Sequence, residues 1–260
     1  MLDRARTASR EDLPGAVGFP PPDDDLWSWV AGSGADSVEL KVLLLPGPGT
    51  GARFTARHAS RVRQRRLYLM DSPDLVLARA GVHVRLRDRG RDRWDVTVRV
   101  RGEGPGADLV RPDGARVEID VLPGVAFHST ELREALDADR AAACRTGRLD
   151  PREVLTAAQA ALLDGVVPGR PPLRAHGPLA VERATVPRPR CRLPHARHER
   201  CRFAGGRLLE EFSARCPPAD APDVAGAVTG FLALHDAAPA EQQRTKTAAW
   251  VEQLLRTSGA

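Results

Sequence analysis

The sequence predicts an α+β protein whose strands form a sheet with one apolar and one strongly ionic face. Three observations predict this class. Several segments alternate between apolar and polar residues, which is the period of a half-buried strand. Other segments begin with helix-capping residues or have the apolar period of a helix. Of the 260 residues, 42% are hydrophobic and 28% are charged, a balance typical of folded globular domains.

Four strands are expected in the first half of the chain, over residues 37–42, 82–87, 95–101 and 116–121. In each of them, an aliphatic residue occupies every second position, and most positions between are charged. Because successive side chains of a strand point to opposite faces, each segment has an apolar and an ionic face. The ionic faces carry Glu39, Lys41, Arg85, Arg87, Arg99, Arg101, Glu118 and Asp120.

The second half of the chain predicts further strands. Residues 179–186 can form one strand. Residues 199–203 and 207–215 have the pattern of a hairpin joined by an Ala-Gly-Gly turn. On the second arm of this hairpin, one face carries Glu211, Ser213 and Arg215.

Helices are expected between and after these strands. Asp150 can cap a helix that ends near Gly165. A shorter helix is expected over 129–138, and the arginine-rich run at 61–66 is interpreted as a solvated helix face. The expected C-terminal helices cover about 222–236 and 239–256.

Residues 1–34 are rich in Pro, Gly and Asp and are interpreted as a flexible leader, which precedes a single domain over 35–260. No apolar run approaches the roughly 20 residues that a membrane-spanning helix needs. The N-terminus lacks the apolar core of a signal peptide. We therefore expect no membrane partner and a cytoplasmic location.

The chain has a formal net charge of +5, from 39 basic and 34 acidic residues. Lys41 and Lys246 are its only lysines, so nearly all basic residues are arginines. Three explanations compete: a nucleic-acid partner, a basic site for an anionic small molecule, and drift in composition. A single arginine is therefore weak evidence for a site, and the two lysines are more informative.

The ionic strand faces are compatible with two architectures. In a β-sandwich they would be solvated, and each ion pair would contribute little. In a closed barrel they would point inward around a polyanion, which would relieve the repulsion between neighbouring arginines. Arginines match phosphate groups with paired donors. Carboxylates beside them suggest a bridging Mg²⁺ or Mn²⁺, which can orient water for hydrolysis.

Several segments resemble motifs of the CYTH superfamily, also called triphosphate tunnel metalloenzymes. Residues 37–41, SVELK, match the family's ExExK strand, except that Ser37 replaces the first glutamate. Residues 68–87, YLMDSPDLVLARAGVHVRLR, match its aromatic-rich strand, its DSPD-type turn and its RxR strand. Weaker matches cover 97–99, 117–124, 205–216 and 242–247.

This resemblance covers about 37–256 and implies an antiparallel eight-stranded β-barrel, a tunnel with a charged interior, flanked by helices. It implies metal-dependent hydrolysis of a phosphoanhydride in a triphosphate-bearing small molecule or polyphosphate, with Mg²⁺ or Mn²⁺ as cofactor. Lys41 and Glu39 would be catalytic. The implied phosphate ligands are Arg85, Arg87, Arg99, Arg101, Arg183, Arg215 and Lys246, and the implied metal ligands are Glu39, Glu118, Asp120 and Glu211.

Alternatives remain at this stage. Since the family glutamate at position 37 helps to bind metal, Ser37 would suit a catalytically weakened polyphosphate- or nucleotide-binding protein. The basic balance would suit an RNA-binding barrel, but one Tyr and six Phe provide few side chains for base stacking. Cys191, His195, His198 and Cys201 have the residue types of a zinc site without its usual spacing, and we interpret them as parts of a loop.

Overall fold

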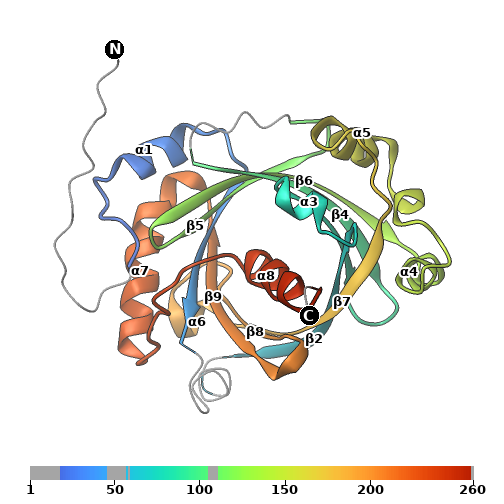
Figure 1. Cartoon of the computed structure of the whole chain (residues 1–260). Helices are drawn as coiled ribbons and strands as arrows, with labels where there is room; N and C mark the ends of the chain where they lie inside the picture. Colours follow the sequence, from blue (N-terminus) through green and yellow to red (C-terminus); the bar gives the residue numbers. More distant parts are fainter. Residues whose placement is uncertain (1–17, 46–56, 58, 105–110, 259–260) are drawn as a thin grey trace.

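The strands of this protein close into a ring (Figure 1). The computed structural model describes residues 18–45, 57, 59–104 and 111–258. The strands are β1 (Ser37–Leu44), β2 (Arg61–Asp71), β3 (Val82–Asp88), β4 (Trp94–Glu103), β5 (Arg116–Leu122), β6 (Val125–Leu136), β7 (Arg174–Thr185), β8 (Arg197–Arg202) and β9 (Leu208–Cys216). Around the barrel their order is β1, β5, β6, β4, β3, β2, β7, β8 and β9, and β9 pairs with β1.

The barrel with flanking helices confirms the predicted class, but the prediction of eight antiparallel strands is wrong. The additional strand is β6, which occupies most of the range expected to be a helix at 129–138. A closed ring with an odd number of strands needs at least one parallel pair. Here β1 and β5 are parallel, and the other neighbours around the ring are antiparallel.

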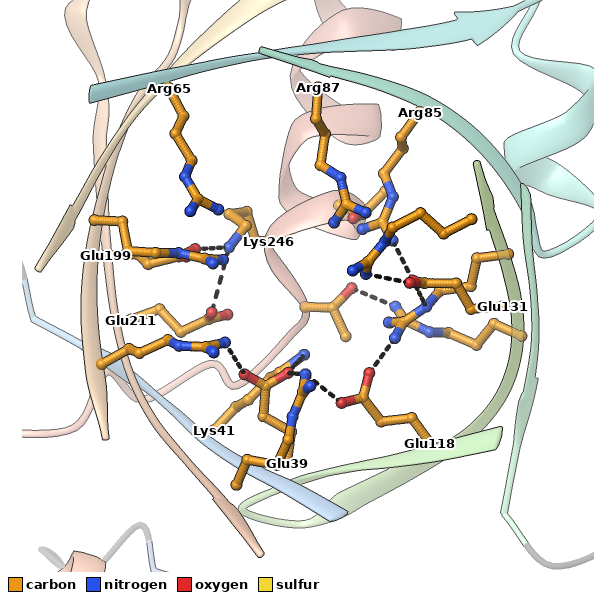
Figure 2. Close-up of a pocket in the computed structure, with 18 of the residues that line it drawn as sticks. Glu39, Lys41, Arg65, Arg85, Arg87, Glu118, Glu131, Glu199, Glu211 and Lys246 are labelled. Atoms are coloured by element: carbon orange, nitrogen blue, oxygen red, sulfur yellow. Dashed lines mark hydrogen bonds and ion pairs between the residues drawn. The ribbon is translucent and has the colours of Figure 1, made fainter. Parts of the chain in front are cut away.

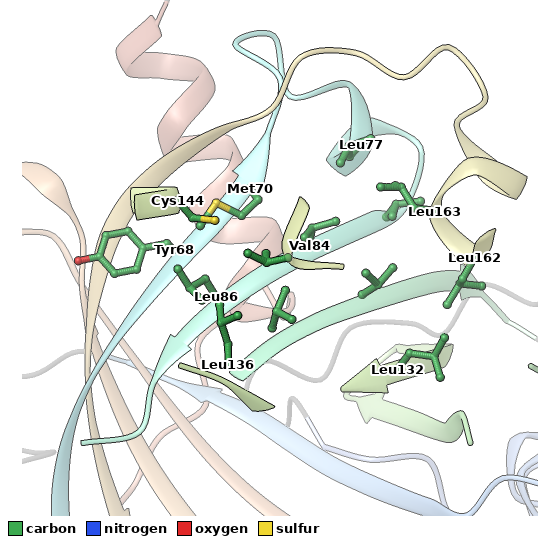
Figure 3. Packing of buried hydrophobic residues seen from close by; sticks show 14 of the residues in the cluster. Tyr68, Met70, Leu77, Val84, Leu86, Leu132, Leu136, Cys144, Leu162 and Leu163 are labelled. Carbon is green, nitrogen blue, oxygen red and sulfur yellow. The ribbon is translucent and has the colours of Figure 1, made fainter. Parts of the chain in front are cut away.

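Apolar side chains of the strands point outward and pack beneath helices. One cluster lies under α4 (Ala138–Arg145) and α5 (Ala157–Val166), where Val84, Leu86 and Leu163 are almost fully buried (Figure 3). On another side of the barrel, α1 (Asp25–Gly32) and α7 (Ala221–Leu234) cover β1, β5 and β9. Each fully buried aliphatic side chain stabilises the fold by about 1.5–3 kcal/mol. These outer cores leave the ionic faces to point inward.

Helix α8 (Lys246–Ser258) lies within the outline of the barrel and fills one of its two mouths (Figure 1). Ala249 and Trp250 of α8 pack against the inward-facing Leu43, Leu69 and Leu179. The interior is therefore apolar at this end and charged towards the other.

The start of α8 differs from the expectation of a helix from about 239. The side chain of Gln243 accepts from the Leu43 N–H at 2.8 Å and donates to the Leu43 carbonyl at 3.0 Å. These bonds hold the segment before α8 along β1 instead of in a helix. Thr245 then accepts from the Ala248 N–H at 3.2 Å and caps α8.

Two other sequence-based expectations need correction. The arginine-rich run at 61–66 is the first part of β2, not a helix. The helix expected from Asp150 is divided into η1 (Pro151–Val154) and α5, because Thr156 begins a second capping box. The expected helix at about 222–236 is confirmed as α7, and the expected hairpin as β8 and β9. The remaining short elements are α3 (Val76–Arg79), α6 (Arg188–Cys191), η2 (Ala204–Gly206) and η3 (Pro218–Asp220).

Part of the expected leader is ordered against the barrel. Asp24 caps α1, and Trp27 and Val30 are buried in the cluster beneath it. Residues 1–17 lie outside the described residues, so the division into a leader and one domain stays an interpretation. Among the described helices, none has the length and hydropathy needed to cross a membrane.

The DSPD turn between β2 and β3 has a structural role. The fully buried carboxylate of Asp71 accepts from the backbone N–H groups of Ser72, Leu77 and Ala78 at 2.7, 2.9 and 2.9 Å. It thereby satisfies amides at the start of α3 that have no partner within the helix.

Replacing this carboxylate should destabilise the protein. We expect Asp71→Ala to lower the free energy of unfolding by about 3 kcal/mol, because three backbone amides, two of them buried, lose their acceptor. Asp74→Ala, at an exposed position of the same turn, should change it by less than about 0.5 kcal/mol. Urea unfolding of both variants measures the difference, and equal effects would contradict this role for Asp71.

Candidate functional site

A cavity of about 140 Å³ lies inside the barrel beside the N-terminus of α8 (Figure 2). This is roughly ten times the volume that one water molecule needs. Among the described residues, its lining consists of twelve cationic side chains, five carboxylates and two threonines, so an anion is the favoured occupant. The lining residues are Glu39, Lys41, Arg65, Arg85, Arg87, Arg89, Arg99, Arg101, Glu118, Glu131, Arg133, Arg183, Arg197, Glu199, Glu211, Arg215, Thr245, Lys246 and Thr247.

Three carboxylates gather on one wall of this cavity. One oxygen each from Glu39, Glu118 and Asp120 lie within 4.8 Å of one another, and all three side chains are buried. The parallel pairing of β1 and β5 produces this arrangement, because it places Glu39 opposite Asp120 and Ser37 opposite Glu118. We call these three residues the acidic cluster.

Asp120 is the fully buried hub of this wall. Lys41 Nζ donates to Asp120 Oδ1 at 2.8 Å and lies 3.2 Å from Glu39 Oε2. Arg99 Nη1 and Arg101 Nη2 donate to the other oxygen, Asp120 Oδ2, at 3.2 and 2.5 Å. One carboxylate therefore orients three cations that face the cavity.

These contacts set the protonation states of the acidic cluster. Burial raises the pKa of Asp120, but Lys41, Arg99 and Arg101 outweigh it and bring the pKa to about 2. Burial also raises the pKa of Glu39, but Lys41 and Arg215 outweigh this effect and hold the pKa well below the usual range. The pKa of Glu118 is raised, chiefly by burial and further by the neighbouring carboxylates, although Arg99 opposes the shift. The cluster thus concentrates negative charge.

The acidic cluster fits a divalent cation. Its donors are carboxylate oxygens, which Mg²⁺ and Mn²⁺ prefer. Arg215 Nη2 lies 2.5 Å from Glu118 Oε1, but outside hydrogen-bond geometry, so this buried oxygen is left without a hydrogen bond in the described structure. A divalent cation would give this oxygen a second positive partner and would reduce the repulsion among the three carboxylates. Glu211, the fourth predicted metal ligand, lies apart from the cluster and pairs with Lys246 at 3.4 Å.

Arginines form the opposite wall (Figure 2). Arg85 Nη2 lies 3.1 Å from Glu131 Oε2, and Arg87 Nε donates to Asp95 at 2.7 Å. Arg65 has no ion pair with any described residue, and its Nε is buried without a hydrogen bond. Burial and neighbouring arginines lower the pKa of Arg85 to about 9 and that of Arg65 to about 10. An anion in the cavity would stabilise the charged form of both.

Helix α8 contributes the third side of the cavity. Lys246, its first residue, pairs with Glu199 and Glu211 across β8 and β9. Burial opposes the charge of Lys246, but these two glutamates raise its pKa above the ordinary value. Thr245 accepts from Arg101 Nη1 at 2.9 Å. The positive N-terminal end of the helix therefore also faces the cavity.

The structure brings the sequence-predicted residues together. Eleven of the twelve line the cavity, and Asp120 lies behind them as their buried partner. The ionic strand faces therefore point inward, as in the barrel interpretation and not the sandwich one. The roles assigned to these residues remain proposals.

Sequence reasoning missed several residues of the lining. Glu131 and Arg65 lie in the segments 129–138 and 61–66, for which the sequence predicts helices. A helix prediction gives no inward strand face, so neither residue is predicted to line a tunnel. Glu199 begins the first arm of the predicted hairpin at 199–203, whereas Arg197 lies just before it, because β8 starts two residues earlier than expected. Their two-residue spacing places both side chains on the same face of β8. The other missed residues are Arg89, Arg133, Thr245 and Thr247.

The candidate zinc site does not form. Cys191 packs in the cluster beneath α7 with Phe212, whereas Cys201 packs in the plug cluster with Trp250. That second cluster is the apolar one between α8 and the inward-facing Leu43, Leu69 and Leu179, so the two thiols lie in different cores. Among the described residues, the only group of potential metal ligands that meets is the acidic cluster.

No protein-family model and no curated protein matches this sequence. Among solved structures, the fold is similar to a proposed adenylyl cyclase from Hippeastrum, described as having a dominant triphosphatase activity. That match has a TM-score of 0.60 and 13% identity, over 83% of this chain and 95% of that chain. A proposed adenylate cyclase from Bacillus halodurans matches with a TM-score of 0.55 and 12% identity, over 81% and 96% of the two chains. At these identities the similarity shows a shared fold.

The missed Glu131 gives a test of the electrostatic organisation. It is buried and pairs with Arg85, Arg99 and Arg133 at 3.1, 3.3 and 2.5 Å. Burial raises its pKa, but these arginines reverse the shift and hold the pKa well below the ordinary 4.5. We expect Glu131→Gln to lower the free energy of unfolding by about 3 kcal/mol at neutral pH, because a buried partner of several cations is lost.

The effect of Glu131→Gln should depend on pH. A carboxyl whose pKa is depressed by folding stabilises the folded state above its unfolded pKa and ceases to do so as pH falls. The difference between wild type and variant should therefore shrink below about pH 4.5. Urea unfolding across this range measures it, with the exposed Glu134→Gln on the same strand as a control. A difference that persists undiminished in acid would refute the ion-pair explanation.

Proposed function

We propose that this chain, which has the fold of the CYTH or triphosphate tunnel proteins, binds a triphosphate-containing compound in the tunnel and hydrolyses one of its phosphoanhydride bonds with a divalent cation. One observation carries this proposal: a cavity inside the barrel with an excess of arginine and lysine lies directly against three clustered carboxylates. The triphosphatase activity described for the Hippeastrum protein agrees with it.

The phosphates would be held by the tunnel cations. Arg85, Arg87 and Arg65 form a wall of planar guanidinium groups, which pair well with phosphate oxygens. Arg65 is available without breaking an ion pair to a described residue, whereas the others must exchange carboxylate partners for phosphate. Arg99, Arg101, Arg183, Arg215 and Lys246 are proposed as further phosphate ligands.

The acidic cluster would hold the metal. Mg²⁺ or Mn²⁺ bound by Glu39, Glu118 and Asp120 would neutralise phosphate charge and polarise the bond to be broken. Without that cation, the three carboxylates would repel a polyphosphate. In the hydrolysis, a water oxygen bonds to phosphorus, the bridging P–O bond breaks, and the water proton passes to solvent or to the released phosphate.

Lys41 is suited to stabilising charge rather than to removing a proton. Burial lowers its pKa, but Asp120 and Glu39 more than compensate and raise it above the ordinary value. The ammonium group therefore remains protonated between two carboxylates. There it can neutralise the negative charge that develops on phosphate oxygens during bond cleavage.

Turnover tests the proposal directly. Phosphate release from tripolyphosphate, ATP or thiamine triphosphate should require Mg²⁺ or Mn²⁺ and stop with EDTA. Lys41→Ala should lower kcat/KM about a hundredfold or more, because it removes a charge that contacts the reacting group. Arg66→Ala, which removes an exposed pair with Asp88, should have little effect. Normal turnover in Lys41→Ala would refute the assignment.

Ser37 allows a test of catalytic weakening. It lies opposite Glu118, where a glutamate would add a fourth carboxylate to the acidic cluster. We expect Ser37→Glu to raise kcat and to tighten Mn²⁺ binding, measured by steady-state kinetics and metal titration. Ser37→Gln, of similar size but uncharged, is the matched control. If the two variants behave alike, the missing charge does not limit this site.

A further inference from the structure

The mouth opposite α8 is bordered by exposed or half-buried arginines. Arg61 and Arg63 lie at the start of β2, and Arg91 and Arg93 lie in the turn between β3 and β4. The two segments are adjacent, because the Cα partners Arg66 and Asp88 place the start of β2 beside the end of β3. We call these four residues the arginine rim.

The β2 part of the rim faces the tunnel axis. Residues 61, 63 and 65 are two positions apart on β2, so their side chains point to the same side of the strand, and Arg65 lines the cavity. Arg63 lies directly opposite Arg183 on β7, which also lines the cavity. The rim therefore continues the cationic lining outward along the same strands.

The rim carries more positive charge than its neighbours neutralise. Arg61 and Arg63 have no ion pair with a described residue. The nearby carboxylate of Asp88 forms its ion pair with Arg66, at 2.8 Å. Asp92 is the other carboxylate of the β3–β4 turn. The pKa of Arg63 is lowered, first by Arg61 and also by Arg93, Arg91 and Arg89. Mutual repulsion of this kind is relieved when an anion binds.

The cavity between the rim and α8 gives no surface for an organic group. Its described lining has neither aromatic nor aliphatic side chains. A separate chamber with Phe127, Val251 and Leu255 does exist, but it lies on the α8 side. The hydrogen bond from Arg101 to Thr245 separates it from the cavity. A ligand that fills both the cavity and the rim is therefore anionic along its length.

We propose that the arginine rim is a second anion site, which binds the part of a linear inorganic polyphosphate that extends out of the tunnel while the chain end occupies the cavity. This inference rests on the proposed function and adds to it a binding surface outside the tunnel. Inorganic polyphosphate fits better than RNA, because its negative charges follow one another without intervening sugars and it has no bases that need a stacking surface.

The test compares affinity for two chain lengths. Tripolyphosphate can fill only the cavity, whereas a linear polyphosphate of about fifteen units can also reach the rim. Two chain ends alone would improve the apparent affinity about twofold. We expect the longer chain to bind at least about tenfold more tightly in calorimetric titrations with Mg²⁺, with a steeper dependence on salt.

Variants of the rim arginines test whether the tighter binding of the longer chain depends on the rim. Arg61→Ala/Arg63→Ala should abolish most of the preference for the longer chain and change the tripolyphosphate Kd by less than about threefold. Arg79→Ala/Arg202→Ala removes the same charge from exposed positions near the α8 end and should keep the preference. Loss of the preference in both double variants would mean a general charge effect and would overturn the rim site.

The outcomes separate this inference from the proposed function. If tripolyphosphate binds and the longer chain binds no better than its two ends predict, the rim site is wrong and the tunnel site stands. If neither binds, both are wrong. If a 5′-triphosphate oligoribonucleotide gains more from the rim than polyphosphate of equal charge, the inferred ligand class is wrong.

Discussion

The structure depends on the closure of a sheet with its ionic face turned inward. Closure turns a dozen cationic side chains towards the interior, and those that become buried would be unfavourable there without a partner. Asp120, Glu131 and Glu199 offset this cost, because each holds two or more cations. They do not balance the charge completely. The remaining positive excess favours an anion in the tunnel, so under the proposed function the same ion pairs would serve both stability and binding.

This balance also explains why a metal and a phosphate would support each other's binding. The acidic cluster repels phosphate and is partly neutralised by Lys41, Arg99, Arg101 and Arg215. If phosphate drew these cations away, the carboxylates would lose their partners, and a divalent cation bound by Glu39, Glu118 and Asp120 would replace the lost positive charge. Each ligand would thus reduce the electrostatic cost of binding the other.

The sequence predicts the inward residues wherever alternation is strict, as in β1, β3, β4 and β5. It fails where local pattern is ambiguous. The β6 segment around Glu131 contains good helix formers, and its pairing with β4 and β5 decides the outcome. Arg65 could not be placed, because the start of β2 is nearly all arginine and has no clear apolar face. Because β6 is not predicted as a strand, the sequence predicts an even number of strands and no parallel pair, whereas the structure has nine strands with β1 and β5 parallel.

The two lysines show how much a few positions can say about a site. In a chain where arginine is the general cation, each lysine bridges two carboxylates inside the tunnel: Lys41 between Glu39 and Asp120, and Lys246 between Glu199 and Glu211. A compact ammonium with three donors can serve two carboxylates and an incoming oxygen at a single point. A planar guanidinium would occupy more of the cavity and direct its donors within one plane. The two exceptions to the arginine composition therefore lie where the geometry of a point charge is required.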